Sequence, residues 1–162
     1  MIFLYFLFIT SNAQAKFMNL RFDVGSIIFS GTDVGILLNL GEKVGIGGSY
    51  TSFDATVATS KAEATGYSAN LAYFFNGFST DSWFFEAQYS LFDAKSSLAG
   101  VTILESTGNR ISVVIAKQWM WSYFNQQLGI GYGTTTVKSS SSLFSSLGGG
   151  GIKILWNIGF AF

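Results

Sequence analysis

The stretch that decides the fold is the end of the chain, 151-GIKILWNIGFAF-162, in which every second residue is large and apolar. The apolar set is Ile152, Ile154, Trp156, Ile158, Phe160 and Phe162. The interleaved set is mostly polar or small: Lys153, Leu155, Asn157, Gly159 and Ala161. Successive side chains of a β-strand point to opposite faces of the sheet, so a period of two predicts a strand with one continuous apolar face.

The composition favours sheet and leaves the surface short of charge. Charged residues make up 11% of the 162 residues, against about 25% in a typical soluble domain. The chain holds 17 Phe, 7 Tyr, 4 Trp and 19 Gly and no Pro, and no apolar run reaches the ~20 residues of a membrane-spanning helix. Nine basic residues balance nine acidic ones, which argues against nucleic acid as a partner. Without Cys, no disulfide or thiolate chemistry is available.

The first fifteen residues, MIFLYFLFITSNAQA, predict a secretory signal peptide. An apolar run over 2–9 leads into a polar stretch and then Ala13-Gln14-Ala15, a small-x-small cleavage pattern. An N-terminal anchor helix is the alternative, but the run is too short to span a bilayer. We therefore expect a mature domain over residues 16–162.

The alternation at the end of the chain recurs seven more times, which predicts eight strands. The earlier segments are 17–25, 34–40, 44–51, 67–75, 83–91, 110–116 and 127–133. Short connections are predicted at 41–43, 76–82 and 118–122, and long ones, rich in Ser, Thr, Ala and Gly, at 54–66, 93–109 and 138–151. Short turns at one end and longer loops at the other are typical of outer-membrane barrels. The first connection, 30–33, is short where a long one is expected.

The residues that alternate with the apolar ones indicate which environment the apolar faces of the strands contact. A soluble lipocalin-like barrel would carry its charges outside, whereas an outer-membrane barrel turns its apolar face to lipid. The interleaved set holds only five charges: Arg21, Asp23, Glu86, Arg110 and Lys153. Five charges over eight strands are too few for a water-facing surface. The predicted fold is therefore all-β, an eight-stranded antiparallel up-and-down transmembrane β-barrel in the outer membrane of a Gram-negative-type bacterium.

The terminal segment ILWNIGFAF resembles the C-terminal strand signal of outer-membrane barrels, carried here by Trp156, Ile158, Phe160 and Phe162. Over residues 16–162 the chain resembles the small OmpA transmembrane-domain and OmpX-like family, with OmpW-like barrels as the second choice. The resemblance implies two partners, outer-membrane lipid and the barrel-assembly machinery during insertion. It also implies that the five interior charges form an ion-pair network that plugs the lumen. A gate whose pairs exchange to admit water or small ions is the alternative.

A second set of residues faces inward by the same parity: Leu37, Phe53, Phe74, Phe84 and Phe92. They pack at the barrel mouths, or they line an apolar conduit for small hydrophobic molecules, as in OmpW-like barrels. On the opposite faces, an interfacial aromatic belt is predicted at Tyr50, Tyr67, Tyr89 and Tyr132.

Catalysis is not expected, because a Ser nucleophile needs a base and the chain contains no His. No spaced cluster of ligands predicts a metal, and no cofactor is expected. The predicted function is a non-enzymatic envelope barrel with a structural role. The alternatives are a conduit for small molecules or ions, and a surface adhesin or accessory subunit that binds a partner through 54–66, 93–109 and 138–151.

Overall fold

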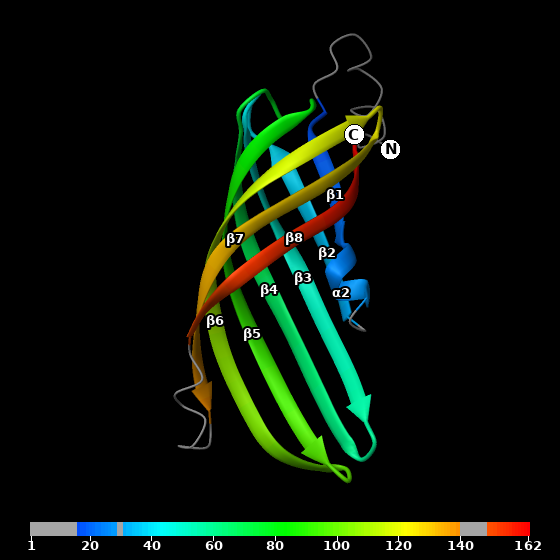
Figure 1. The fold of residues 1–162 in the computed structure, drawn as a ribbon, viewed down its shortest axis with the longest axis vertical. Coiled ribbons are helices and arrows are strands. Elements are labelled where there is room, and N and C mark those ends of the chain that lie inside the picture. Colours follow the sequence, from blue (N-terminus) through cyan, green and yellow to red (C-terminus); the bar gives the residue numbers. More distant parts are fainter. Residues whose placement is uncertain (1–15, 29–30, 140–148) are drawn as a thin grey trace, which may run out of the picture.

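The computed structural model describes residues 16–28, 31–139 and 149–162 and confirms the predicted fold class, a closed eight-stranded antiparallel barrel (Figure 1). The strands are β1 (Met18–Asp23), β2 (Gly31–Asn39), β3 (Val44–Val57), β4 (Ser60–Phe74), β5 (Ser82–Leu98), β6 (Val101–Trp121), β7 (Phe124–Ser139) and β8 (Gly149–Ala161). Each strand pairs with its neighbours in the sequence, and β1 pairs with β8 to close the barrel. The predicted signal peptide, 1–15, lies outside the described residues.

The terminal strand β8 shows how the two faces are used. Ile152 and Ile154 are among the most exposed large apolar residues, at 72% and 69%, and Trp156, Phe160 and Phe162 also face outward. On the other face of the same strand, Leu155, Asn157 and Ala161 are buried in the lumen. Apolar side chains outside and polar ones inside are the reverse of a soluble barrel, and this distribution fits a transmembrane barrel.

Aromatic rings gather at two levels of the outer face. At one level, Tyr50 of β3 lies opposite Tyr67 of β4 in the register, with ring centroids 5.3 Å apart. At the other level, near the chain termini, neighbouring rings pack as Tyr73–Phe75, Phe75–Phe85 and Trp121–Phe124, with centroids 5.4 to 5.8 Å apart. Two aromatic girdles with an apolar band between them are the arrangement expected at two membrane–water interfaces.

Two of the three predicted long loops are strand instead. Residues 54–66 form the tip of the β3–β4 hairpin, which turns at Ala58 and Thr59, and 93–109 form the tip of the β5–β6 hairpin, which turns at Ala99 and Gly100. Both hairpins stand well beyond β1 and β2 (Figure 1). The prediction was wrong because it followed apolar side chains, and beyond the apolar band most outward positions are polar or charged, as at Asp54, Lys61 and Lys95. Of the third loop, 138–139 and 149–151 lie in β7 and β8, and 140–148 lie outside the described residues.

The first strand is shorter than predicted. β1 ends at Asp23, and the short helix α2 (Val24–Ile28) takes up Val24 and Gly25, which the sequence pattern placed in the strand. The Asp23 carboxylate accepts a hydrogen bond of 2.7 Å from the Ser26 N–H and so caps the helix, which stops the strand. Among the described residues, no helix is long and apolar enough to cross a membrane.

Candidate functional site in the barrel lumen

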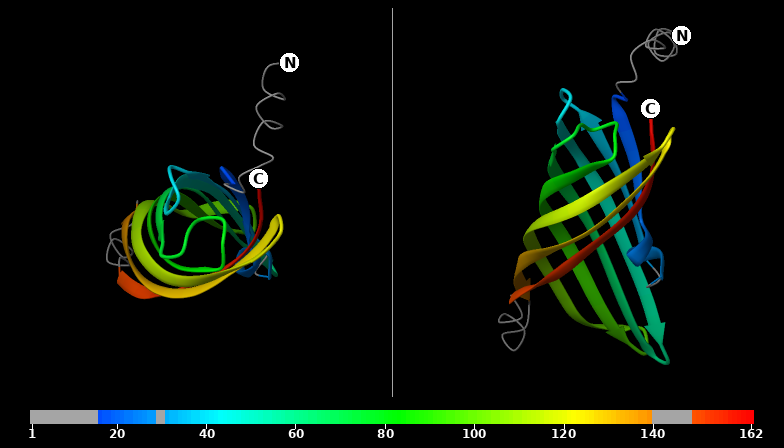
Figure 2. Two further views of the ribbon diagram at one scale, coloured as in Figure 1. Left: turned by 90° about the horizontal axis from the view of Figure 1, so that it is seen from above. Right: turned by 45° about the horizontal axis from the view of Figure 1, so that its top comes forward.

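The mouth of the barrel nearest the termini is closed by the connection between β4 and β5. Figure 2 shows this connection crossing the lumen in the view along the barrel. Phe78 lies at its centre and is almost completely buried. Its ring packs edge-on against Phe74 at 5.3 Å, and Phe74 stacks on Phe84 at 4.8 Å. The Phe78 N–H donates to the Glu42 carbonyl at 2.8 Å. We call Phe74, Phe78, Phe84 and Leu37 the apolar plug.

Two glycines make room for the apolar plug. Gly77 adopts a φ of +120°, which a residue with a side chain rarely takes, and this turns the chain so that Phe78 points inward. Gly45 lies against the plug, where an added Cβ would stand 2.8 Å from Leu37 Cδ2 and 3.2 Å from Phe78 Cε2. Leu37 and the ring of Phe78 therefore occupy the space that a side chain at position 45 would need.

Buried amides form the next layer of the lumen. Gln118 Nε2 donates to the Phe78 carbonyl at 2.9 Å, and Gln118 Oε1 accepts from Gln127 Nε2 at 2.8 Å. Gln127 Oε1 in turn accepts from Asn157 Nδ2 at 3.2 Å. Each of these buried amides donates a hydrogen bond to a buried acceptor. The chain of amides therefore connects the apolar plug to β6, β7 and β8.

One ion pair spans the lumen beyond the amide layer. Arg21 Nη1 of β1 lies 2.5 Å from Glu86 Oε2 of β5, and the two side chains are only 4% and 3% exposed. The same nitrogen is 3.5 Å from Gln127 Oε1, which links the ion pair to the amides. Removal of either partner from a buried pair of this kind is strongly destabilising, because the other charge is then left uncompensated.

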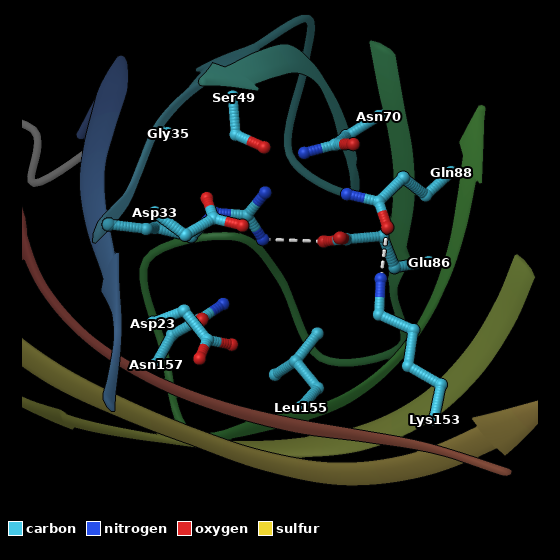
Figure 3. A pocket seen from close by; sticks show the side chains of 11 residues that line it. Asp23, Asp33, Gly35, Ser49, Asn70, Glu86, Gln88, Lys153, Leu155 and Asn157 are labelled. Carbon is cyan, nitrogen blue, oxygen red and sulfur yellow. Dashed lines mark hydrogen bonds and ion pairs between the residues drawn. The ribbon is translucent and has the colours of Figure 1, made fainter. Parts of the chain in front are cut away.

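The other three predicted interior charges are not joined to this pair by a salt bridge between described residues. Lys153 Nζ instead donates to Gln88 Oε1 (Figure 3) and lies 3.5 Å from Ser112 Oγ. Asp23 caps α2. Arg110 is half-buried, and its Nε has no hydrogen-bond partner within the described part of the chain. The predicted network is thus one ion pair with separate hydrogen bonds around it.

Asp33 is an interior charge that the sequence pattern missed, because 30–33 was assigned to a loop. It lies in β2, where its Oδ2 accepts from Thr51 Oγ1 at 2.8 Å. Asp33 brings the lumen to three acidic and three basic side chains, so their formal charges cancel. A cavity of about 60 Å³ lies among them, lined by Arg21, Asp23, Asp33, Glu86 and Lys153 with six further residues (Figure 3). It has room for only a few water molecules.

The predicted apolar lumen is split between the two ends of the barrel. Leu37, Phe74 and Phe84 belong to the apolar plug, whereas Phe53 and Phe92 lie near the hairpin tips. Phe84 and Phe92 are on the same strand, about 26 Å apart at the usual rise per residue, with Glu86 and Gln88 between them. These five side chains therefore form no continuous apolar path.

The lumen offers hydrogen bonds and one ion pair, but no group of three His, Cys, Asp or Glu side chains in the described residues is placed to hold a metal ion. Sequence reasoning missed Phe78, Asp33 and Gln118, because each fell in a segment assigned to a connection: 76–82, 30–33 and 118–122. An isolated Phe within the connection 76-NGFSTDS-82 was the one signal for the plug. In comparisons with protein-family models, curated proteins and solved structures, nothing matched the chain. The fold is compatible with an outer-membrane protein.

Proposed function

We propose that this chain is a non-conducting, non-enzymatic barrel of the outer membrane with a structural role in the cell envelope. The observation that carries the proposal is the double closure of the lumen. The apolar plug fills the mouth nearest the termini, and the Arg21–Glu86 pair spans the lumen further inside the barrel. An eight-stranded barrel is just wide enough for its interior to be filled by side chains.

Three features support the membrane assignment. The outer face carries an apolar band, with the Tyr50–Tyr67 pair at one level and a cluster of aromatic rings near the termini at the other. Because β1 pairs with β8, the sheet closes into a barrel and has no edge strand on either side. This suits a lipid environment, which cannot hydrogen-bond to a free strand edge. The terminal residues Trp156, Ile158, Phe160 and Phe162 resemble the strand signal of outer-membrane barrels, so we include the assembly machinery among the partners.

The sequence supports a role without catalysis, since a Ser nucleophile in the lumen would have no His to act as its base. The best-placed carboxylate, Glu86, is paired with Arg21 rather than presented to a substrate. A transport role through the lumen would need both closures to open.

A second candidate is a contact surface for another envelope component, which the projecting hairpins favour. The outer face of the β3–β4 tip carries the pairs Lys61–Asp54 (3.1 Å) and Lys61–Glu63 (2.5 Å), and that of the β5–β6 tip carries Lys95–Glu105 (3.4 Å). If the hairpins are the contact, shortening both to the level of Tyr67 abolishes partner capture and leaves barrel folding unchanged.

Single-channel recording of the refolded protein in a planar bilayer tests the main proposal. We expect a silent wild type, and silence also from Phe78→Ala and from Arg21→Ala/Glu86→Ala, because each variant keeps one closure. Steady openings are expected only when all three substitutions are combined. Flotation of the same samples with liposomes shows that the barrel has inserted. Steady openings of the wild type would refute the proposal.

A further inference from the structure

The outer face of β4, β5, β6 and β7 carries a hollow of about 420 Å³ at the edge of the apolar band. Eight of the eleven residues that line it face outward, in two rows that the strand register defines, and Gly66, Phe92 and Gly108 lie between the rows. The row nearer the hairpin tips is Thr65, Asp93, Thr107 and Lys138, and the row nearer the apolar band is Tyr67, Leu91, Asn109 and Thr136. Each residue in a row lies opposite the next one on the neighbouring strand.

The hollow straddles the level at which the outer face changes from apolar to polar. Tyr67 and Leu91 are both exposed, at 68% and 53%, and belong to the girdle and the band below it. Asp93 lies two residues beyond Leu91 on β5, and Thr107 lies opposite Asp93 on β6, in the first fully polar row. In a bilayer, this is the level of the lipid headgroups.

Two opposite charges in this polar row are left without partners. Within the described residues, neither Asp93 nor Lys138 forms an ion pair, whereas Lys61, Lys95 and Glu105 nearer the tips are all paired. Thr107 separates Asp93 from Lys138, so their backbones are about 10 Å apart at the usual strand spacing. That separation leaves room between the two charges for a group that carries both signs.

We propose that the hollow binds the headgroup of a membrane phospholipid that carries a phosphate and a primary ammonium. The phosphate lies at Lys138 with the hydroxyls of Thr107 and Thr136, and the ammonium donates to Asp93. The acyl chains run from there across Leu91 and Tyr67 into the apolar band. The inference rests on the proposed membrane location, and it adds a lipid-recognition site to a barrel whose lumen is closed.

The probes are phosphatidylethanolamine, phosphatidylcholine and phosphatidylglycerol, each added to the purified full-length barrel in detergent and followed by native mass spectrometry. Phosphatidylcholine has no N–H donor on its cation, and phosphatidylglycerol has no cation. We expect one phosphatidylethanolamine to be retained more strongly than either of the others. Asp93→Asn and Lys138→Gln each weaken its retention by about threefold or more, the size of an exposed charge contact.

Lys95→Gln is the matched control, since Lys95 lies on the same outer face but outside the hollow and is already paired with Glu105. It leaves lipid retention unchanged. Equal retention of the three lipids, or retention that neither Asp93→Asn nor Lys138→Gln changes, overturns the site. Free phosphoethanolamine that binds as well as the lipid overturns the lipid assignment. Liposome flotation reports separately on the membrane location, so its failure is distinguishable from failure of the headgroup site.

Discussion

Arg21 and Glu86 are joined across the lumen from opposite walls of the barrel, β1 and β5, through a 2.5 Å contact that solvent barely reaches. The guanidinium lies at the barrel's shortest strand, and the carboxylate lies on one of its long hairpins. The pair therefore ties the closing strand to the wall that faces it.

Removal of one partner from this pair is expected to cost more stability than removal of both. Arg21→Met or Glu86→Gln alone leaves the other group without its partner in the lumen, and breaking a buried pair typically costs about 3–5 kcal/mol. The double variant Arg21→Met/Glu86→Gln, which combines the same two substitutions, should recover part of that loss. Urea unfolding of the lipid-inserted barrel, followed by tryptophan fluorescence, measures the three free energies of unfolding. Strictly additive losses would show that the two residues do not interact.

Phe78 is expected to keep reagents out of the mouth nearest the termini. The chain has no Cys, so a cysteine introduced at Ala72, which is fully buried behind the plug, reports on access to the lumen. A charged thiol reagent should label Ala72→Cys slowly, and much faster when Phe78→Ala is added. Phe75→Ala is the control, because Phe75 lies in the same connection but points outward. Equal acceleration by Phe75→Ala would contradict a plugging role for Phe78.

Gly131 of β7 is expected to tolerate no side chain, because an added Cβ would stand 2.0 Å from the Val113 carbonyl oxygen. Gly131→Ala should lower the free energy of unfolding by about 1–3 kcal/mol, the usual cost of overpacking. Gly151→Ala on β8 is the control, since a Cβ at that position meets nothing within 4 Å. The measurement is the urea midpoint of unfolding of each variant, which should be lower for Gly131→Ala than for Gly151→Ala. Equal midpoints would mean that β6 and β7 separate at this point without a cost in stability.

The two ends of the barrel should lie on opposite sides of the outer membrane. Thr59→Cys lies at the β3–β4 tip, and Glu42→Cys lies in the β2–β3 turn beside the plug. A membrane-impermeant thiol reagent added to intact cells should label Thr59→Cys and reach Glu42→Cys only after the outer membrane is permeabilised. The reverse pattern would invert the orientation, and labelling of neither residue before lysis would contradict the outer-membrane assignment.

Alternation along the strands was enough to predict the fold and the lumen-facing positions of Arg21, Glu86 and Phe84, because a period of two is a local property of the backbone. The hairpin tips escaped the prediction because their outward positions hold charges such as Lys61 and Lys95, where the apolar band has ended.

The closure by Phe78 could not be predicted in the same way. It depends on the Glu42 carbonyl and on the space beside Gly45, and both lie far from Phe78 in the sequence and meet it only in the folded barrel. Asp33 was missed for a simpler reason, since it lies in 30–33, the segment that was taken as a loop. The partners of each interior charge depend in the same way on which strands the closed sheet brings together.

The short first strand also has a consequence for the order of assembly. β1 and β8 share only the pairs from Asn19–Ala161 to Asp23–Asn157, whereas all 17 residues of β5 pair with β6. Hairpins between neighbouring strands close small loops, but the β1–β8 seam must bring together the two ends of the domain, which costs more chain entropy. The central hairpins are therefore expected to form first, and the β1–β8 seam is expected to pair last. The β1–β8 seam is also where the strands of the folded barrel would first separate during unfolding.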